Sequence, residues 1–233
     1  MPWCREYAHV DITPPRQAPL LNEMDIYAWN KLRLSSVRSN GIKLSRLPQK
    51  PLQSNHDAYL GVVLLSGEYL LEQAGREVFL RPGDMTIYDA TRPHSITCPG
   101  PFSKLLVSIP RVLLEQRLAG AEHCTARTIP GHVGIGAVAA EFIRSSSAEA
   151  QAMSQTTFDA LSENALELFT LALQQIRPPA SQLSRSRSLS LFSIKSQVEK
   201  LLPPRSWILP CWLRLPAYRR ATSMNCWQQN RAR

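Results

Sequence analysis

The sequence predicts an α+β protein: an antiparallel barrel or sandwich of short strands, then helices, then a linker and an irregular basic tail. From Asp25 to about Pro110, alternating apolar and polar stretches are separated by turn residues at a spacing of roughly ten residues. After Pro110 the apolar periodicity becomes helical, most clearly over Met153–Ile176. The net charge of +9 is confined to the end of the chain: residues 177–233 contain eleven Lys and Arg and one acidic residue, whereas the remainder carries a net charge of −1.

The strand region has the alternation and the turns of consecutive hairpins. The run Tyr59–Leu65 is continuously apolar and short enough to be a core strand. Arg81-Pro82-Gly83-Asp84 predicts a tight turn, because Pro presets φ and Gly accepts positive φ. Residues 1–24 are Pro-rich, and we expect them to be irregular apart from a short possible strand at Val10–Ile12. Further strands are expected around Leu32–Leu34 and Ile42–Leu44 and at Glu68–Gln73, Glu77–Leu80, Met85–Tyr88, Ser95–Cys98 and Phe102–Ile109.

The helical region is dominated by one long segment, Met153–Ile176, which has two apolar stripes; shorter helices are expected near residues 112–118 and at Ile135–Arg144. A helix covered on most of its circumference needs two apolar neighbours. We predict that the first stripe packs within the chain and that the second packs on a partner chain; the alternative is that both stripes lie in the chain's own core. The first stripe is Phe158, Leu161, Ala165, Leu168 and Ala172, and the predicted dimerisation stripe is Leu166, Phe169, Leu173 and Ile176.

These patterns divide the chain into five segments. Residues 1–110 are expected to form the barrel, and residues 111–178 a helical dimerisation region. Arg177-Pro178-Pro179 ends the long helix, and residues 179–190, rich in Ser and Arg, have the composition of a linker. Residues 191–202 carry one apolar face of a short helix, and residues 203–233 are expected to be an aberrant or disordered basic tail.

The last segment, residues 203–233, has an unusual composition, with no Asp or Glu, six Arg and three of the five Trp. Such a composition is typical of GC-rich coding sequence translated out of frame. Residues 224–229 fix enough bases that the neighbouring frame must encode Glu-Leu-Leu-Ala, a run of strong helix formers. We interpret the segment as the product of a frameshift that replaced a helix-turn-helix. The alternative is a natural, disordered basic tail.

The order of several motifs carries a family resemblance. Gly83–Asp89 followed by Pro93-His94 resembles the second half of a cupin barrel. Together with the opening Trp3–Tyr7, the helices, the linker and Ile194–Glu199, it resembles AraC/XylS-type transcription regulators over about residues 3–202, in particular the subgroup that responds to feruloyl- and benzoate-type compounds or to amines. The resemblance implies a cupin-like sensor barrel, a dimerising helix pair and two helix-turn-helix units. Residues 191–202 would be the remnant of the first DNA-binding helix.

The residues argue against an enzyme. A metal-dependent cupin needs a His-x-His cluster with a Glu and a later His, whereas here only His56 and His94 fall in the two relevant regions. No nucleophile–base pair or Gly-x-Ser-x-Gly elbow is visible. We expect no metal and no cofactor. The five Cys include no Cys-x-x-Cys pair, and the sequence shows neither a secretory signal nor a membrane span, so we expect a cytoplasmic protein.

The sequence therefore predicts the effector-sensing, dimerising portion of such a regulator, without specific DNA binding as translated. The expected partners are a small, organic effector, a second copy of the chain, and DNA bound weakly and without sequence preference. The alternatives are a cupin-type enzyme and a non-specific nucleic-acid-binding protein acting through its basic tail. Inward-facing strand residues should line the effector pocket, and the candidates are Tyr59, Val62, Leu64, Met85, Ile87 and His94.

Overall fold

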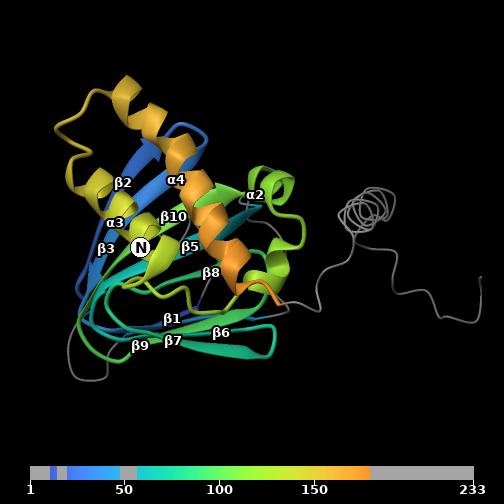
Figure 1. The fold of residues 1–233 in the computed structure, drawn as a ribbon. Coiled ribbons are helices and arrows are strands. Elements are labelled where there is room, and N and C mark those ends of the chain that lie inside the picture. The colour runs from blue at the N-terminus through green and yellow to red at the C-terminus, as the bar shows by residue number, and fades with distance from the viewer. Residues whose placement is uncertain (1–10, 15–19, 48–56, 179–233) are drawn as a thin grey trace, which may run out of the picture. The chain divides into compact units, whose positions relative to one another are not determined.

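The computed structural model describes residues 11–14, 20–47 and 57–178, and shows two antiparallel sheets that face each other, with helices over the outer face of one of them (Figure 1). This agrees with the expected α+β class and the expected antiparallel strand region. The predicted linker at 179–190, the helix at 191–202 and the tail at 203–233 lie outside the described residues.

Each sheet has five strands. The first, sheet A, has the order β1-β4-β9-β6-β7, and the second, sheet B, has the order β2-β3-β10-β5-β8. All pairs of neighbouring strands are antiparallel. The strands of sheet A are β1 (Asp11–Thr13), β4 (Ile42–Arg46), β9 (His94–Cys98), β6 (Tyr69–Gln73) and β7 (Arg76–Leu80), and those of sheet B are β2 (Asn22–Trp29), β3 (Leu32–Ser39), β10 (Phe102–Pro110), β5 (Ala58–Ser66) and β8 (Met85–Asp89).

Strand β2 is the one long strand that the sequence did not reveal. It forms a hairpin with β3 through a turn in which Asn30 adopts φ 55°, a left-handed conformation that Asn tolerates. Its residues are mostly exposed or half-buried because it lies at the edge of sheet B, so it lacks a continuous apolar pattern.

Two hydrophobic cores lie on the two faces of sheet B. The inner core fills the space between the sheets and includes Leu44, Val62, Leu71, Ile96 and Leu106. The outer core lies between sheet B and the helices and includes Trp29, Val63, Ile87, Val107 and Phe169. Because both faces of β5 and β8 are covered, nearly all their residues are buried, which explains the continuous apolar run at the start of β5.

Up to residue 178, where the described part ends, four helical elements follow β10: α2 (Arg111–Arg117), the short 3-10 helix η1 (Ala121–Cys124), α3 (Gly134–Ala148) and α4 (Gln155–Ile176). Ser154 caps α4, since its hydroxyl accepts a hydrogen bond from the amide of Thr157 at 3.2 Å. The first turns of α4 are tied to the β2–β3 hairpin. Trp29 stacks on Phe158 at 5.3 Å and donates from its indole nitrogen to the Phe158 carbonyl at 2.6 Å.

The predicted dimerisation stripe lies inside the chain itself. Leu166, Phe169 and Leu173 are buried in the outer core, and Ile176 packs against its edge. The prediction that this stripe faces a partner is therefore wrong, and the alternative, that both stripes lie in the chain's own core, is correct. The physical reason is that α4 rests on sheet B along one stripe and contacts its neighbouring helices along the other.

The packing of α4 on sheet B leads to a prediction at Gly61. A Cβ atom at this position would lie 2.6 Å from Cζ of Phe169, whose ring is buried against the strand. Ala is normally better than Gly within a strand, but here we expect Gly61→Ala to lower the free energy of unfolding by about 1–3 kcal/mol, because the ring must shift in a filled core.

Urea denaturation of the purified chain measures this effect. The matched control is Gly100→Ala in an open turn, where a Cβ atom meets nothing within 4 Å, and we expect a change below about 0.5 kcal/mol. Equal stability of the Gly61→Ala variant and the wild type would refute the close packing of Phe169 on β5.

Candidate functional site

The space between the two sheets is apolar except for a small set of buried polar side chains. Alternation along each strand sends every second residue into this space. In β10 these residues are Phe102, Lys104 and Leu106, and in β4 they are Ile42, Leu44 and Arg46. Four of the interior polar residues, Arg46, Gln73, His94 and Lys104, are at most 7% exposed.

One group of interior polar residues forms a row across sheet A. Arg46 pairs with His94, and His94 pairs with Gln73, in adjacent strands. Gln73 is held by the backbone of Asp89, to which its amide donates at 2.9 Å and from which it accepts at 2.8 Å. Gln73 therefore holds sheet A to the end of β8. In contrast, one guanidinium nitrogen of Arg46, Nη1, is buried without a hydrogen-bond partner among the described residues.

His94 is a neutral imidazole in this environment. Burial lowers its pKa to about 4, and the positive charges of Arg46 and Lys104 add to this effect, while a hydrogen bond to the Arg92 carbonyl opposes it. Nδ1 lies 2.9 Å from that carbonyl, so we assign the proton to Nδ1, which leaves Nε2 as an acceptor. The ring packs against Tyr88 with a centroid separation of 4.8 Å.

The second group gathers around Lys104. Its ammonium lies 4.8 Å from the ring centroid of Tyr69 and 5.5 Å from that of Phe102. Burial lowers the pKa of Lys104, and the neighbouring Cys98 opposes this slightly. Burial raises the pKa of Tyr69 well above its usual value, so its hydroxyl stays protonated, and this hydroxyl has no hydrogen-bond partner among the described residues. The arrangement places an amine and a hydroxyl donor in the interior.

The six predicted pocket residues do not share one face. Val62, Leu64 and His94 lie in the interior between the sheets. Tyr59, Met85 and Ile87 lie on the opposite face of sheet B, in the outer core, so the prediction that they point into the barrel is wrong. Where both faces of a strand are covered, an apolar run does not indicate which alternate residues point inward.

Tyr59 belongs to a charged network on that other face. Arg111, the first residue of α2, donates to the hydroxyl of Tyr59 at 2.9 Å and to the carboxylate of Asp89 at 2.7 Å. Hydrogen bonds from Arg111 and Thr91 hold the pKa of Asp89 below its usual range although burial alone would raise it. The network links β5 and β8 to the start of α2, and we interpret it as structural because its charges are paired.

Sequence reasoning missed Arg46, Tyr69 and Lys104. A signal was present for Arg46 and Lys104, because each is a charged residue two positions from an apolar residue of a strand, Leu44 and Leu106, respectively, whereas Tyr69 is uncharged. A charged residue on the apolar face of a strand is unusual and marks a candidate site.

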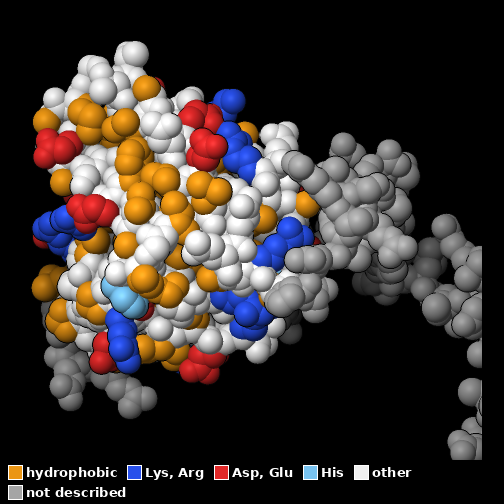
Figure 2. Space-filling view, viewed as in Figure 1, with side chains coloured by type: hydrophobic (Ala, Val, Ile, Leu, Met, Phe, Trp, Pro, Cys, Tyr) orange, Lys and Arg blue, Asp and Glu red, His pale blue; other side chains and the backbone are white. Residues whose placement is uncertain are grey.

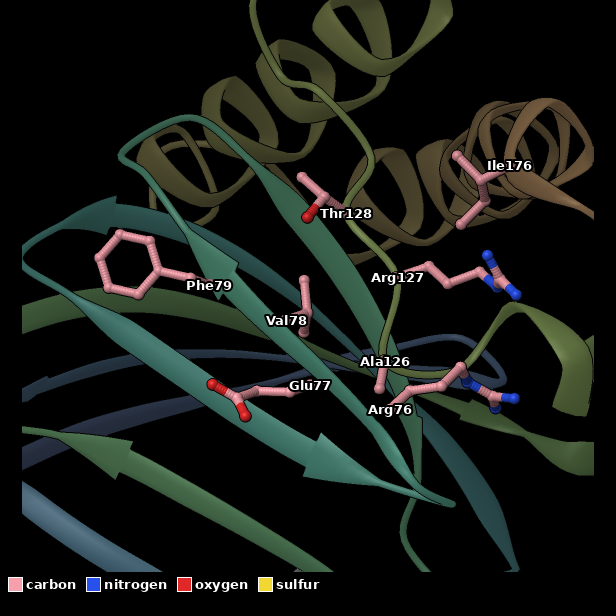
Figure 3. Close-up of a pocket in the computed structure, with 8 residues that line it drawn as sticks. All are labelled: Arg76, Glu77, Val78, Phe79, Ala126, Arg127, Thr128 and Ile176. Carbon is pink, nitrogen blue, oxygen red and sulfur yellow. The ribbon is translucent and has the colours of Figure 1, made fainter.

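A shallow surface depression of about 560 Å³ lies on the outside of the molecule, between β7 and the end of α4 (Figure 3). The side chains of Arg76 and Arg127 lie toward one end of it and Phe79 at the other. The guanidinium of Arg76 already has hydrogen-bond partners within the chain, since it donates to the Thr125 carbonyl at 2.8 Å and to the Thr125 hydroxyl at 2.6 Å. The depression is lined by Arg76, Glu77, Val78, Phe79, Ala126, Arg127, Thr128 and Ile176. We regard the interior as the better candidate.

Among residues 11–14, 20–47 and 57–178, no group of three or more His, Cys, Asp or Glu side chains is placed to hold a metal ion. Within the same residues, no helix is long and apolar enough to cross a membrane.

Comparisons with known proteins agree with this architecture. The transcriptional activator NphR of Rhodococcus sp is 27% identical over 166 residues, which are 70% of this chain and 50% of that protein. A protein of the nit 5′ region of Bacillus sp. (strain OxB-1) is 26% identical over 111 residues, 48% of this chain and 43% of that protein. This chain thus spans about half the length of the curated relatives it matches.

The crystal structure of the AraC-like transcriptional activator CuxR has the same fold, with a TM-score of 0.68 at 14% identity, over 84% of this chain and 73% of that one. A family model for the AraC-binding-like domain matches residues 3–174. Since this match includes every described strand and nearly all of the described helices, the chain belongs to the AraC-binding-like domain family.

Proposed function

We propose that the chain is the effector-sensing, dimerising portion of an AraC-type transcription regulator, and that a small organic effector binds between the two sheets. The observation that carries this proposal is the set of buried polar side chains in an otherwise apolar interior. Ligand sites are mainly apolar with a few polar groups that fix orientation, and the interior has this composition. We further propose that the protein works in the cytoplasm and acts by binding rather than by catalysis.

A pair of adjacent residues in β5 tests the location of the site. Val62 points into the interior and Val63 into the outer core, and both are at most 1% exposed. We expect Val62→Phe to abolish binding of the effector by filling the interior. Val63→Phe should leave binding within about threefold, although both variants lose about 1–3 kcal/mol of stability from overpacking.

The measurement is a thermal-denaturation screen of the full chain against small organic acids, amines, phenols and alcohols, in which a bound compound raises the midpoint with increasing concentration. Calorimetric titration of each hit with both variants then follows. Survival of binding in Val62→Phe, or equal loss in both variants, would place the site elsewhere.

The proposed dimer needs a surface other than the stripe first predicted. A Cβ atom on Gly134 would lie 4.0 Å from the Gln175 side chain, so the start of α3 lies beside the end of α4. Val138 lies one helical turn after Gly134 and Leu171 one turn before Gln175, so the two residues lie at the same level of the helix pair. Their side chains are 54% and 43% exposed, respectively. Figure 2 shows hydrophobic side chains gathered over α3 and α4 on this face. We propose that this face contacts a second copy.

Sedimentation of the full chain at tens of micromolar tests the dimer. We expect Val138→Glu and Leu171→Glu to shift the protein to monomer while it stays folded, because both side chains are exposed in the single chain. Leu173→Glu should instead unfold the protein, since Leu173 is 0% exposed. Phe79→Glu, an exposed apolar position on β7, is the control and should remain dimeric. A monomeric wild type, or dimers that persist in both helix variants, would contradict the proposal.

Our expectation for DNA rests on sequence alone, because residues 179–233 are outside the described part. Pro203, Pro204, Pro210 and Pro216 oppose helices there, and a recognition helix is needed to read base edges. We expect weak association that falls steeply with salt and shows no preference between the gene's own upstream region and unrelated duplexes at about 150 mM salt. A titration that separates these duplexes by more than tenfold would show that the chain reads DNA sequence.

A further inference from the structure

We propose that an extended acidic segment of a partner protein binds beside β7, pairs with the free edge of this strand, and places a carboxylate at Arg127 and Arg76. The site is the depression on the outside of the molecule that β7 shares with residues 126–128 and the end of α4 (Figure 3). The inference goes beyond the proposed function, since it concerns a partner other than the effector, a second copy or DNA. It is carried by an unpaired strand edge, an apolar wall beside it, and two arginines without a described acid.

The outer edge of β7 has backbone groups without partners among the described residues. The turn Ala74-Gly75 has positive φ at both residues, as in a two-residue hairpin, so Gln73 and Arg76 form the first hydrogen-bonded pair of β6 with β7. Hydrogen bonding alternates along an antiparallel strand, so Glu77 and Phe79 direct their N–H and C=O groups away from β6. Both residues line the depression, and their backbone groups are available there to a further strand.

The edge of sheet B across the depression is covered, unlike that of β7. Residues 126–129 run along β8: the amide of Ala126 donates to the Ile87 carbonyl at 2.9 Å, and Met85 and Ile129 exchange backbone hydrogen bonds at 2.9 and 2.8 Å. On the side of β7 that faces away from β6, no described segment pairs with it, and the strand contains neither a Pro nor a bulge that would protect its edge. Such an edge is a template for an added strand, whose main-chain hydrogen bonds supply affinity.

An apolar wall beside this edge would contact the side chains of the added strand. Phe79 is 52% exposed and lies at the end of the depression opposite the two arginines (Figure 3). Val78, Ala126 and Ile176 also line the depression. Its volume of about 560 Å³ lies within the usual range of binding pockets, roughly 300–1,000 Å³. The added segment should therefore carry apolar side chains next to its acidic residue.

The arginine end of the depression lacks an acid among the described residues. The guanidinium of Arg76 donates to the carbonyls of Glu122 and Thr125, and that of Arg127 donates to the His123 carbonyl at 3.1 Å. Neither arginine forms an ion pair with a described carboxylate. Burial lowers the pKa of Arg76, and the positive charge of Arg127 adds to this effect, so the two cations repel each other. A carboxylate would relieve this repulsion through charge-assisted hydrogen bonds.

These features together favour a peptide over other occupants. A nucleic acid would be attracted by the arginines, but it has no main-chain pattern that extends a sheet. Antiparallel pairing of two copies about Val78 would place Leu80 of the second copy, and no acid, opposite Arg76. Only an extended peptide with an acidic residue uses the strand edge, the apolar wall and the arginines at once.

Selection from short random peptides displayed on phage, with the full chain immobilised, tests the inference. We expect the selected peptides to carry Asp or Glu at one end of an apolar run. A selected peptide is then synthesised together with its amide analogue, Asp→Asn or Glu→Gln, and both are titrated by fluorescence anisotropy. The acidic peptide should bind at least about tenfold more tightly than the amide. Arg127→Gln should remove this difference, whereas Arg38→Gln, at an exposed position on β3, should keep it.

A matched pair at Glu77 tests the strand edge itself. Glu77→Pro removes an outward N–H of β7 but none of the bonds to β6, and it should weaken peptide binding at least about tenfold. Glu77→Thr keeps the N–H and should bind within about threefold of the wild type. Phe79→Ala, at an exposed side chain, should fold and weaken binding several-fold, which guards against a folding defect in Glu77→Pro.

Several results would overturn the inference. They are the absence of any enriched peptide, equal binding of the acidic peptide and its amide analogue, and unchanged binding in both Glu77→Pro and Phe79→Ala. A dimeric wild type that becomes monomeric in Glu77→Pro would show that a second copy occupies the edge, and this result would also overturn it.

Discussion

The contact on which this structure depends is that of α4 with sheet B, where the ring of Phe169 lies on the bare backbone of Gly61. Sheet B is apolar on both faces, so without the helices its outer face, with Trp29, Val63 and Ile87, would be exposed to water. The strand region and the helical region, which sequence patterns separate at Pro110, therefore share one hydrophobic core. The same contact explains why Leu166, Phe169 and Leu173 cannot form an interface with a second chain.

Charged side chains are buried on both faces of sheet B, but the partners of these side chains differ. On the helix side, Arg111 is paired with Asp89 and bonded to Tyr59, which is the arrangement expected of buried charges that stabilise a fold. On the inner side, Nη1 of Arg46 and the hydroxyl of Tyr69 have no hydrogen-bond partner among the described residues. Unsatisfied groups reduce stability, and the helix side holds two of them as well, Asp89 Oδ2 and Glu115 Oε2.

The sequence predicted the type and order of most elements, because hairpin turns and a long helical periodicity are local signals. The expected helix at Met153–Ile176 is observed at Gln155–Ile176, and the run Tyr59–Leu65 lies within β5. Two features of the described fold could not be predicted from the sequence. The edge strand β2 has no apolar alternation, and the inward face of β5 and β8 could not be chosen because both faces are buried. Tyr59, Met85 and Ile87 were therefore assigned to the wrong side, whereas Lys104 could have been found from its place between Phe102 and Leu106.

The two-sided burial of sheet B also suggests how an interior ligand would affect the helices. Val62 and Leu106 face the interior, while Gly61 and Leu105, their neighbours in the same strands, face the outer core. Because packed cores do not compress, a displacement of β5 or β10 by the proposed effector between the sheets would be taken up by the side chains behind them, first of all Phe169. Phe169 belongs to α4, and Leu171, on the exposed side of that helix, belongs to the proposed dimer face. The helix α4 thus lies between the proposed effector site and the proposed dimer contact. A shift of α4 relative to Gly61 would therefore couple the two sites.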